Sequence, residues 1–551
     1  MEMLYTTPDQ EKHYLACGMW GDLTLFERFR KHALESPERL AIIDAKRHYS
    51  YGELARLVDN LATNLLALGI GRGQVVAAQL PNWGELPLIH LALNRIGALC
   101  VPIHESWREL EVGHLLKQSG AVAVVVPRNH RDFDYPAMMA RLHGELPALS
   151  RIFSIGGIAP NSTAFEPLLD DVAVDTKALD ARRPHPNEPG GVMLSSGTTA
   201  LPKISVWSSN NLHACVYPAL RSIRFGREDV AAALAPAGTG AVGYAFPILG
   251  PLIFGGATVI LEHWDPAAAV QLILKHRCTY AVAVPAQMTQ MLPALEAHAP
   301  AEFTGFKAFF NGGAPLAYEV ARQIEERMNC RVICNYGATD AGTVGTIDLD
   351  DPREKRLGTV GRPSAGREVK LVDASGSEVA PGEPGEIYWR TPDKSYGYLN
   401  DPEATRAAFT ADRFYKSGDL GRFDADGYLM IIGRVKDMIL RGGRNISPRL
   451  IEEAMIKHPA ILEVAVAAMP DRVLGERACA FAVLKKGCKL GFEELIAFLK
   501  ESKVSVWQLP ERLEIMEDLP RSAGGKIAKN KLTEFISLRL REEASRAPTP
   551  R

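Results

Sequence analysis

Helical and strand-like patterns alternate along the first part of the chain, and this order constrains the fold more than any other feature. Residues 54–70 carry apolar side chains at helical spacing, residues 74–80 show a strand pattern, and residues 88–98 return to helical spacing. The run AVAVVVP at 121–127 is continuously apolar, as in a strand buried on both faces. The alternation predicts a mostly parallel sheet, and it continues through 257–286.

The pattern changes after Gly358. The segments EVKLVD, GEIYWR, GYLNDP and RFYKSGDLGRFDADGYLMIIGR predict short strands separated by Gly/Asp turns, as in an antiparallel sheet. A helix and strand pattern resumes beyond Arg434. We therefore expect an α/β protein with a large N-terminal domain over 1–434 and a small C-terminal α/β domain over 435–551. The large domain should contain two parallel-sheet subdomains and one antiparallel β subdomain.

The charge balance argues against a nucleic-acid partner. The chain has 63 Lys and Arg residues against 65 Asp and Glu residues, whereas nucleic-acid binders usually show a basic excess. The N-terminal segment MEMLYTTPDQEKHY lacks the apolar stretch of a secretory signal, so we expect a cytoplasmic protein. The eight cysteines form no CxxC pair, which favours buried thiols over a zinc site.

One uncharged stretch, Val230 to Leu261, is long enough to span a bilayer. Glycine and proline interrupt it repeatedly, which disfavours a continuous helix in water or in lipid. We therefore expect buried strands, a loop and a packed helix here, and no membrane span. The interrupting residues are Gly238, Gly240, Gly243, Gly250, Gly255, Gly256, Pro236, Pro247 and Pro251.

The strongest local motif is LSSGTTALPK at 194–203, which follows the strand-like segment GVML. Four hydroxyls, a glycine and a lysine can surround a polyphosphate with O–H and N–H donors and one cation. The nucleotide-hydrolase P-loop instead requires GxxxxGK[ST], whereas Lys203 lies between Pro202 and Ile204. A P-loop ATPase is therefore disfavoured.

This motif resembles the phosphate loop of the adenylate-forming superfamily, which includes acyl-CoA synthetases, aryl-acid AMP ligases, luciferases and peptide-synthetase adenylation domains. Further segments similar to that family follow in the same order along the chain. They are NGGAPL at 311–316, NYGATD at 335–340, YKSGD at 415–419, GRVKD at 433–437, RGGRNI at 441–446 and PRSAGGKI at 520–527.

The resemblance implies ATP as a substrate, Mg²⁺ as the metal and coenzyme A as cosubstrate. It implies that Lys526 is catalytic, between the attacking carboxylate and the α-phosphate, that Asp340 holds Mg²⁺, that Lys436 is the hinge, and that Gly442 and Gly443 line the path of CoA. The ATP-binding residues that it implies are Ser195, Ser196, Gly197, Thr198, Thr199, Lys203, Gly313, Ala314, Pro315, Asn335, Tyr336, Gly337, Thr339, Asp419 and Arg434.

These positions also suit the chemistry. The glycines at 312, 313 and 337 let backbone approach a flat purine, on which Tyr336 can stack, although turn geometry alone would also explain each glycine. Asp340 replaces the usual Glu with a shorter oxygen ligand. A positioned Lys526 would stabilise the negative charge that accumulates when two anions approach. Its exposed loop also suggests a lysine acetyltransferase and deacetylase as partners.

The substrate pocket departs from several relatives. The resemblance places Thr239, Gly240, Tyr244 and Gly312 at the acyl pocket, with Thr239 at a common His position and Gly240 where hydroxybenzoate ligases carry Asn. Amino-acid adenylation domains carry an Asp in this region, but no acid lies between Val230 and Leu261. We therefore expect an apolar pocket. Ala200 and Ile204 replace further loop glycines of the family.

The sequence therefore predicts an acid–CoA ligase that forms an acyl-AMP intermediate. Its substrate is expected to be a compact alicyclic or short-to-medium-chain monocarboxylic acid, similar to cyclohexanecarboxylate, with benzoate-like acids second. One alternative is an AMP ligase that loads a carrier-protein thiol. An alternative of another class is a non-catalytic acyl-nucleotide binding protein, suggested by Thr239, Ala200 and Asp340.

Overall fold

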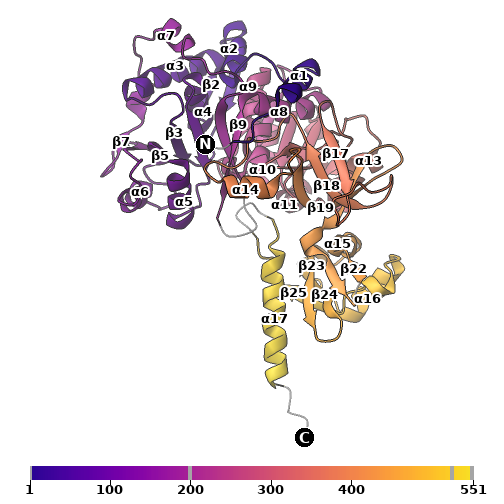
Figure 1. The fold of residues 1–551 in the computed structure, drawn as a ribbon. Helices are drawn as coiled ribbons and strands as arrows, with labels where there is room; N and C mark the ends of the chain where they lie inside the picture. Colours follow the sequence, from indigo (N-terminus) through magenta and orange to yellow (C-terminus); the bar gives the residue numbers. More distant parts are fainter. Residues whose placement is uncertain (1–2, 196–200, 443, 522–525, 547–551) are drawn as a thin grey trace.

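The computed structural model of the chain describes residues 3–195, 201–442, 444–521 and 526–546. It forms a large body and a smaller one that extends from it, with the C-terminal helix along the smaller body (Figure 1). Among the described residues, no helix combines the length and the hydropathy needed to cross a membrane.

The first parallel sheet confirms the alternating pattern of the sequence. Its five strands run in the order β4-β3-β5-β6-β7, and every neighbouring pair is parallel. The strands are β3 (Val75–Gln79), β4 (Leu99–Ile103), β5 (Ala123–Pro127), β6 (Arg151–Ile155) and β7 (Thr163–Ala164). The helices around it are α3 (Tyr51–Ala67), α4 (Glu85–Arg95), α5 (Glu109–Ser119), α6 (Tyr135–His143) and α7 (Thr176–Asp180).

The second sheet has seven strands in the order β14-β13-β12-β10-β11-β1-β2, and only its edge strand β2 is antiparallel. The strands are β1 (Leu40–Ile43), β2 (His48–Ser50), β10 (Val230–Ala233), β11 (Ala257–Ile260), β12 (Tyr280–Ala283), β13 (Ala308–Asn311) and β14 (Arg331–Cys334). The nearby helices are α1 (Pro8–Ala16), α2 (Leu25–Glu35), α8 (Ser209–Ser222), α9 (Gly250–Phe254), α10 (Pro266–Lys275), α11 (Pro285–Leu295), α12 (Tyr318–Met328) and α13 (Arg353–Gly358).

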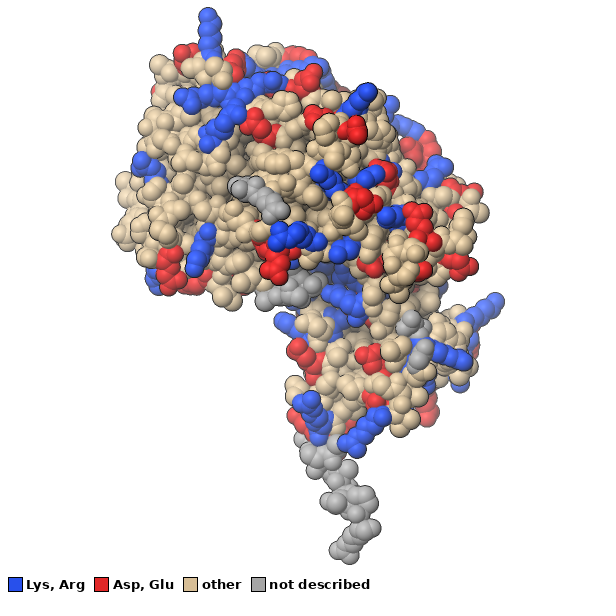
Figure 2. All heavy atoms as spheres, viewed as in Figure 1, with Lys and Arg blue, Asp and Glu red and all other residues tan. Residues whose placement is uncertain are grey.

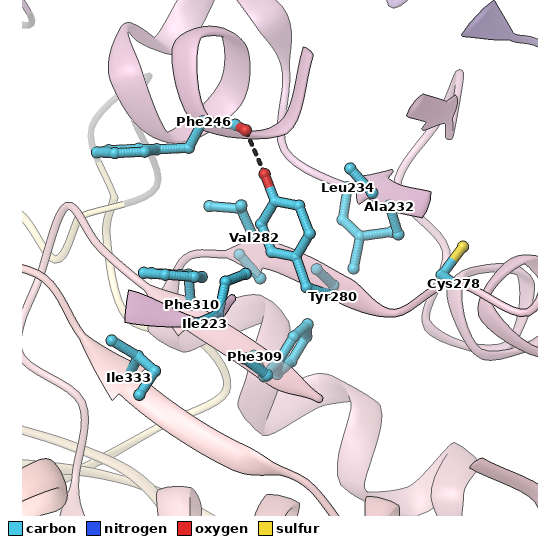
Figure 3. Packing of buried hydrophobic residues seen from close by; sticks show 14 of the residues in the cluster. Ile223, Ala232, Leu234, Phe246, Cys278, Tyr280, Val282, Phe309, Phe310 and Ile333 are labelled. Carbon is cyan, nitrogen blue, oxygen red and sulfur yellow. Dashed lines mark hydrogen bonds between the residues drawn. The ribbon is translucent and has the colours of Figure 1, made fainter. Parts of the chain in front are cut away.

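The uncharged stretch Val230 to Leu261 is buried within the protein. It forms β10, a short 3₁₀ turn, a π-helix over Ala241–Leu249, α9 and β11. In a π-helix the backbone hydrogen bonds follow a wider spacing than in an α-helix. The Tyr280 hydroxyl donates a hydrogen bond to the main-chain carbonyl of Phe246 in this segment, within the apolar core (Figure 3). The sequence pattern gave no indication of this π-helix.

The phosphate motif lies on an antiparallel hairpin, whose first strand confirms the strand-like segment GVML and whose second strand was not predicted. Its strands are β8 (Pro189–Ser195) and β9 (Lys203–Ser208), and Ser195, the last residue of β8, pairs with Lys203, the first residue of β9. Two further short strands, β15 (Gly337–Ala338) and β16 (Gly342–Thr343), pair directly after β14. Both hairpins therefore bring their motifs to the same large domain.

The predicted antiparallel subdomain is confirmed, with one correction. Strands β17 (Glu368–Val372), β18 (Gly385–Arg390), β19 (Tyr415–Phe423) and β20 (Leu429–Arg434) form a sequential antiparallel sheet. The prediction of a strand at GYLNDP is wrong. That segment makes a single bridge, from Tyr398 to Ser205, and then enters helix α14 (Pro402–Ala408), which the Asp401 side chain caps.

The small domain has its own five-stranded sheet. Its strands are β21 (Ile439–Arg441), β22 (Arg444–Ile446), β23 (Ile461–Asp471), β24 (Gly475–Leu484) and β25 (Arg512–Met516). Helices α15 (Pro448–Met455), α16 (Phe492–Glu501) and α17 (Lys529–Arg546) accompany it. The chain passes from the sheet of β20 to that of β21 through residues 435–438.

Candidate active site

A carboxylate on β19 is held between a tyrosine and an arginine. Asp419 pairs with Arg434 across the β19–β20 ladder, and the Arg434 Nε donates to Asp419 Oδ1 at 2.6 Å. The Tyr336 hydroxyl donates to Asp419 Oδ2 at 2.7 Å. Burial, followed by the charge of Asp419, raises the pKa of Tyr336, so this hydroxyl remains a donor. Each carboxylate oxygen can accept two hydrogen bonds, and each has one of these partners, so Asp419 retains capacity for two further hydroxyls.

Asp340 lies beside this group. Its side chain is 9% exposed, and Oδ1 accepts a hydrogen bond of 2.7 Å from Ser205 on β9. The Tyr415 hydroxyl lies 3.5 Å from Oδ2, a long contact that leaves this oxygen capacity for another partner. The hydroxyl of Ser395 binds the main-chain carbonyl of Asp340. The chain thus fixes a carboxylate next to the base of the phosphate hairpin.

The small domain supplies a lysine to the same place. Lys526 remains accessible to solvent, yet it lies in a region crowded with protein. Loss of solvation and the charge of Arg434 lower its pKa, whereas the carboxylates of Asp419 and Asp340 oppose that shift. Figure 2 shows Lys and Arg side chains where the two domains meet. Lys526 therefore belongs to the same electrostatic cluster as the three charged residues of the large domain.

The phosphate hairpin is described only at its base. The Lys203 Nζ lies 4.7 Å from the centre of the Tyr398 ring, beside Ser195. The predicted residues Ser196, Gly197, Thr198 and Thr199 lie outside the described residues.

Packing within the protein requires glycine at two of the motif positions. A Cβ at Gly312 would approach Val242 Cγ2 to 2.8 Å, and one at Gly337 would approach the Gly342 carbonyl oxygen to 2.3 Å. Close packing therefore explains these two glycines without a purine. Gly313 differs, because it is exposed and has a φ of +85°. Pro315 is also exposed, and the side chains of Ala314 and Asn335 are half-buried.

The predicted acyl-pocket residues fall into two environments. Gly240 has a φ of +74°, and a Cβ there would lie 3.1 Å from Thr339 Oγ1. This packing joins the loop before the π-helix to the NYGATD motif. Tyr244 is 2% exposed, and its hydroxyl contacts His90 Nδ1 at 3.0 Å in the core. Its role in an acyl pocket stays a prediction, and the side chain of Thr239 lies outside the description.

A narrow crevice next to Asn335 was not anticipated from the sequence. Helix α8 forms one wall, and β13, β14 and the segment after β16 form the other. Cys215, Ala219 and Ser222 recur on α8 at helical spacing, and this stripe of small side chains was the available sequence signal. Other residues that line the crevice include Phe310, Ile333, Cys334, Thr343 and Ile347; Figure 3 shows Phe310 and Ile333.

The predicted hinge lies on the connection between domains. Lys436 occupies a short 3₁₀ turn, Val435–Asp437, between β20 and β21. Burial, followed by the charge of Arg434, lowers the pKa of Lys436. Gly442 is exposed with a φ of +55°, and its N–H donates to the Leu474 carbonyl at 2.8 Å. Gly443 lies outside the described residues.

Comparison with known proteins places this site in a family. Residues 29–399 match the family described as AMP-binding enzyme, and residues 450–526 match the AMP-binding enzyme C-terminal domain. The chain is 34% identical to a medium-chain fatty-acid–CoA ligase of Escherichia coli, over 98% of this chain and 96% of the relative. It is 31% identical to a 2,3-dihydroxybenzoate-AMP ligase of Bacillus subtilis, over 97% of each.

Solved structures agree with this assignment. ATP-bound MatB from Rhodopseudomonas palustris is 25% identical and has a TM-score of 0.82, covering 94% of this chain and 99% of MatB. The anthranilate CoA ligase AuaEII shares the fold with a TM-score of 0.84. The chain therefore belongs to the AMP-binding enzyme family and is an adenylate-forming acid ligase.

Proposed function

We propose that the chain is an ATP-dependent acid–CoA ligase that acts on an apolar monocarboxylic acid. The carboxylate attacks the α-phosphorus of ATP, forming the acyl–phosphate bond of acyl-AMP and releasing pyrophosphate. The thiol of coenzyme A then loses its proton and attacks the acyl carbon, forming the thioester and releasing AMP. The observation that carries this proposal is the Asp419 carboxylate held by Arg434 at 2.6 Å and by Tyr336 at 2.7 Å, with Lys526 within electrostatic reach.

The charged residues have distinct roles in the proposal. Asp419 accepts the ribose hydroxyls of ATP with its remaining lone pairs, and Arg434 fixes that carboxylate. Lys526 stabilises the charge that develops between the attacking carboxylate and the α-phosphate, which favours the transition state over the separate substrates.

Asp340 suits Mg²⁺ because Oδ2 is a hard oxygen with spare coordination capacity. The ion would neutralise charge on the phosphate oxygens, and Thr339 would contact a phosphate.

The sequence around the predicted acyl pocket supports an apolar acyl group. No charged residue lies between Val230 and Leu261, and the walls of the narrow crevice beside Asn335 include Phe310, Ile333 and Ile347. Similarity to a medium-chain fatty-acid–CoA ligase supports such a substrate, and cyclohexanecarboxylate is the compact acid that we propose to test first.

The thiol acceptor has two candidates. Similarity to the medium-chain fatty-acid–CoA ligase supports coenzyme A, and the exposed Gly442 leaves space for its narrow pantetheine arm. Transfer to a carrier-protein thiol is the alternative, since the chain is also 31% identical to enterobactin synthase component E of E. coli over 96% of this chain.

A pyrophosphate-release screen over linear, alicyclic and aromatic acids tests the proposal. We expect release with aliphatic or alicyclic acids, and faster AMP release when free CoA is added. If acyl-AMP accumulates and added CoA does not consume it, the carrier-protein alternative is favoured. Absence of acid-dependent pyrophosphate release across the panel would refute the ligase, and a tenfold preference for 2,3-dihydroxybenzoate, about 1.4 kcal/mol, would refute the apolar pocket.

A further inference from the structure

Two histidines and a glutamate meet where the two parallel sheets approach each other. His130 follows β5 of the five-stranded sheet, and Glu262 and His263 follow β11 of the seven-stranded sheet. The His130 and His263 ring centres are 5.0 Å apart. One ligand atom from each of the three residues lies within 4.8 Å of the other two. The sequence separates these residues too widely to suggest a shared site.

His130 has an unused nitrogen. Its side chain is 9% exposed, and its Nε2 is buried without a hydrogen-bond partner among the described residues. A buried polar atom without a hydrogen-bond partner destabilises the folded protein. A bound ligand that contacts this nitrogen would remove that cost. The main chain of His130 is fixed, because it exchanges two hydrogen bonds with Phe133 across a tight turn.

Trp83 positions the two partners of His263. Its indole Nε1 donates to Glu262 Oε1 at 2.6 Å, which leaves Oε2 for another interaction. Its ring also packs edge-on against His130 at 5.8 Å. The adjacent Asn82 amide donates to the carbonyl of Leu261 at 3.0 Å, which holds the chain just before Glu262. Outer hydrogen bonds of this kind orient metal ligands in proteins.

One nearby cation lies close to this cluster. The Lys46 ammonium lies over the Trp83 ring and is the cation that competes for Glu262.

We propose that His130, Glu262 and His263 form a binding site for a divalent transition-metal ion, with Zn²⁺ as the first candidate. Two imidazoles and one carboxylate are a common ligand set for zinc, and water can complete the tetrahedron. Mg²⁺ fits poorly, because it prefers six oxygen ligands. The bound ion would link the ends of β5 and β11 and stabilise the contact between the two sheets.

Zinc binding to tag-free, chelator-treated protein tests the site, with excess Mg²⁺ present and ATP absent. We expect one Zn²⁺ per chain, a higher melting temperature with Zn²⁺, and a Co²⁺ derivative with the visible absorption of a tetrahedral site. His130→Ala, Glu262→Gln and His263→Ala should each weaken binding at least tenfold, and Trp83→Phe should weaken it by roughly 10–100-fold, as expected for an outer partner.

His298→Ala is the matched control, because among the described residues this histidine contacts a single carboxylate, Glu302, at 3.0 Å. It should leave binding unchanged. The proposal is overturned if the three ligand variants bind Zn²⁺ as tightly as the original chain, or if the original chain binds no stoichiometric Zn²⁺. If one variant fails to fold, the others and the Co²⁺ spectrum of the unmodified protein still decide the question.

Discussion

Removal of Lys526 should separate the two half-reactions. Near a protein surface, two unit charges about 4 Å apart interact by about 4 kcal/mol. Only the stabilisation that the transition state gains beyond the ground state contributes to the rate. Losing one donor that stabilises developing charge typically lowers the rate by about 10²–10³-fold. Arg434 lies in the same cluster and remains in the variant. We therefore expect Lys526→Ala to lose about 10²–10³-fold in acyl-AMP formation.

Single-turnover measurements of each half-reaction provide the assay. Lys526→Ala supplied with premade acyl-AMP should form the thioester at the original rate. Lys531→Ala, which removes an exposed lysine of α17, is the matched control and should retain both steps. Acetylation of Lys526 should reproduce the loss, because it removes the same charge. Equal loss in both half-reactions would refute the assignment.

The pH dependence gives a second readout of the same lysine. Burial and Arg434 hold the pKa of Lys526 below its usual range, so its charge is lost at a lower pH than for a free lysine. The adenylation rate should therefore fall as pH rises through that lowered pKa, and this alkaline limb should be absent in Lys526→Ala. An unchanged limb in the variant would assign the titration to another group.

Three further predictions follow. Lys436→Pro should reduce thioester formation at least tenfold in a single-turnover assay and largely keep adenylation, because proline fixes φ in the turn between the domains; the opposite split would misplace the hinge. Gly240→Ala should lower kcat/KM for ATP by roughly tenfold, since its backbone, with φ +74° and ψ −140°, lies in a region essentially restricted to glycine, and such strain costs about 1–3 kcal/mol. Gly491→Ala, with open space around it, should not. Burial lowers the pKa of His213 to about 3, so below pH 6.5 the unfolded chain binds an extra proton and the free energy of unfolding should fall by up to about 1.4 kcal/mol per pH unit. His213→Phe should reduce this slope in urea titrations between pH 6.5 and 5, and an unchanged slope would contradict it.

The sequence predicted correctly those helices and strands whose formation depends on the spacing of their own apolar residues. Apolar spacing located α3, β3, α4 and β5 within a few residues, because each buries a continuous face. The strand predicted at GYLNDP failed because pairing with the phosphate hairpin and the Asp401 cap determine that segment. The π-helix also depends on tertiary partners, among them Tyr280.

The site shows the same division. Family motifs located Asp419, Arg434 and Lys526, and the structure brings these three into one cluster. Motifs could not show that Gly312 and Gly337 are required by Val242 and by the β15–β16 hairpin, since close approach is a property of the packed chain. The His130 cluster combines residues far apart in sequence, so no local pattern indicated it. For the crevice, the stripe of small side chains on α8 was the one local signal.

The small domain has two apolar cores, and the side chains that form them come from residues 439 to 540. Substitutions in the large domain therefore leave these two cores untouched. In the proposed enzyme, the choice of acid and the movement of the small domain could then evolve separately. Separate cores also favour separate unfolding of the two bodies, because multi-domain proteins commonly depart from a single cooperative transition. On warming, we expect turnover to be lost while the larger body stays folded.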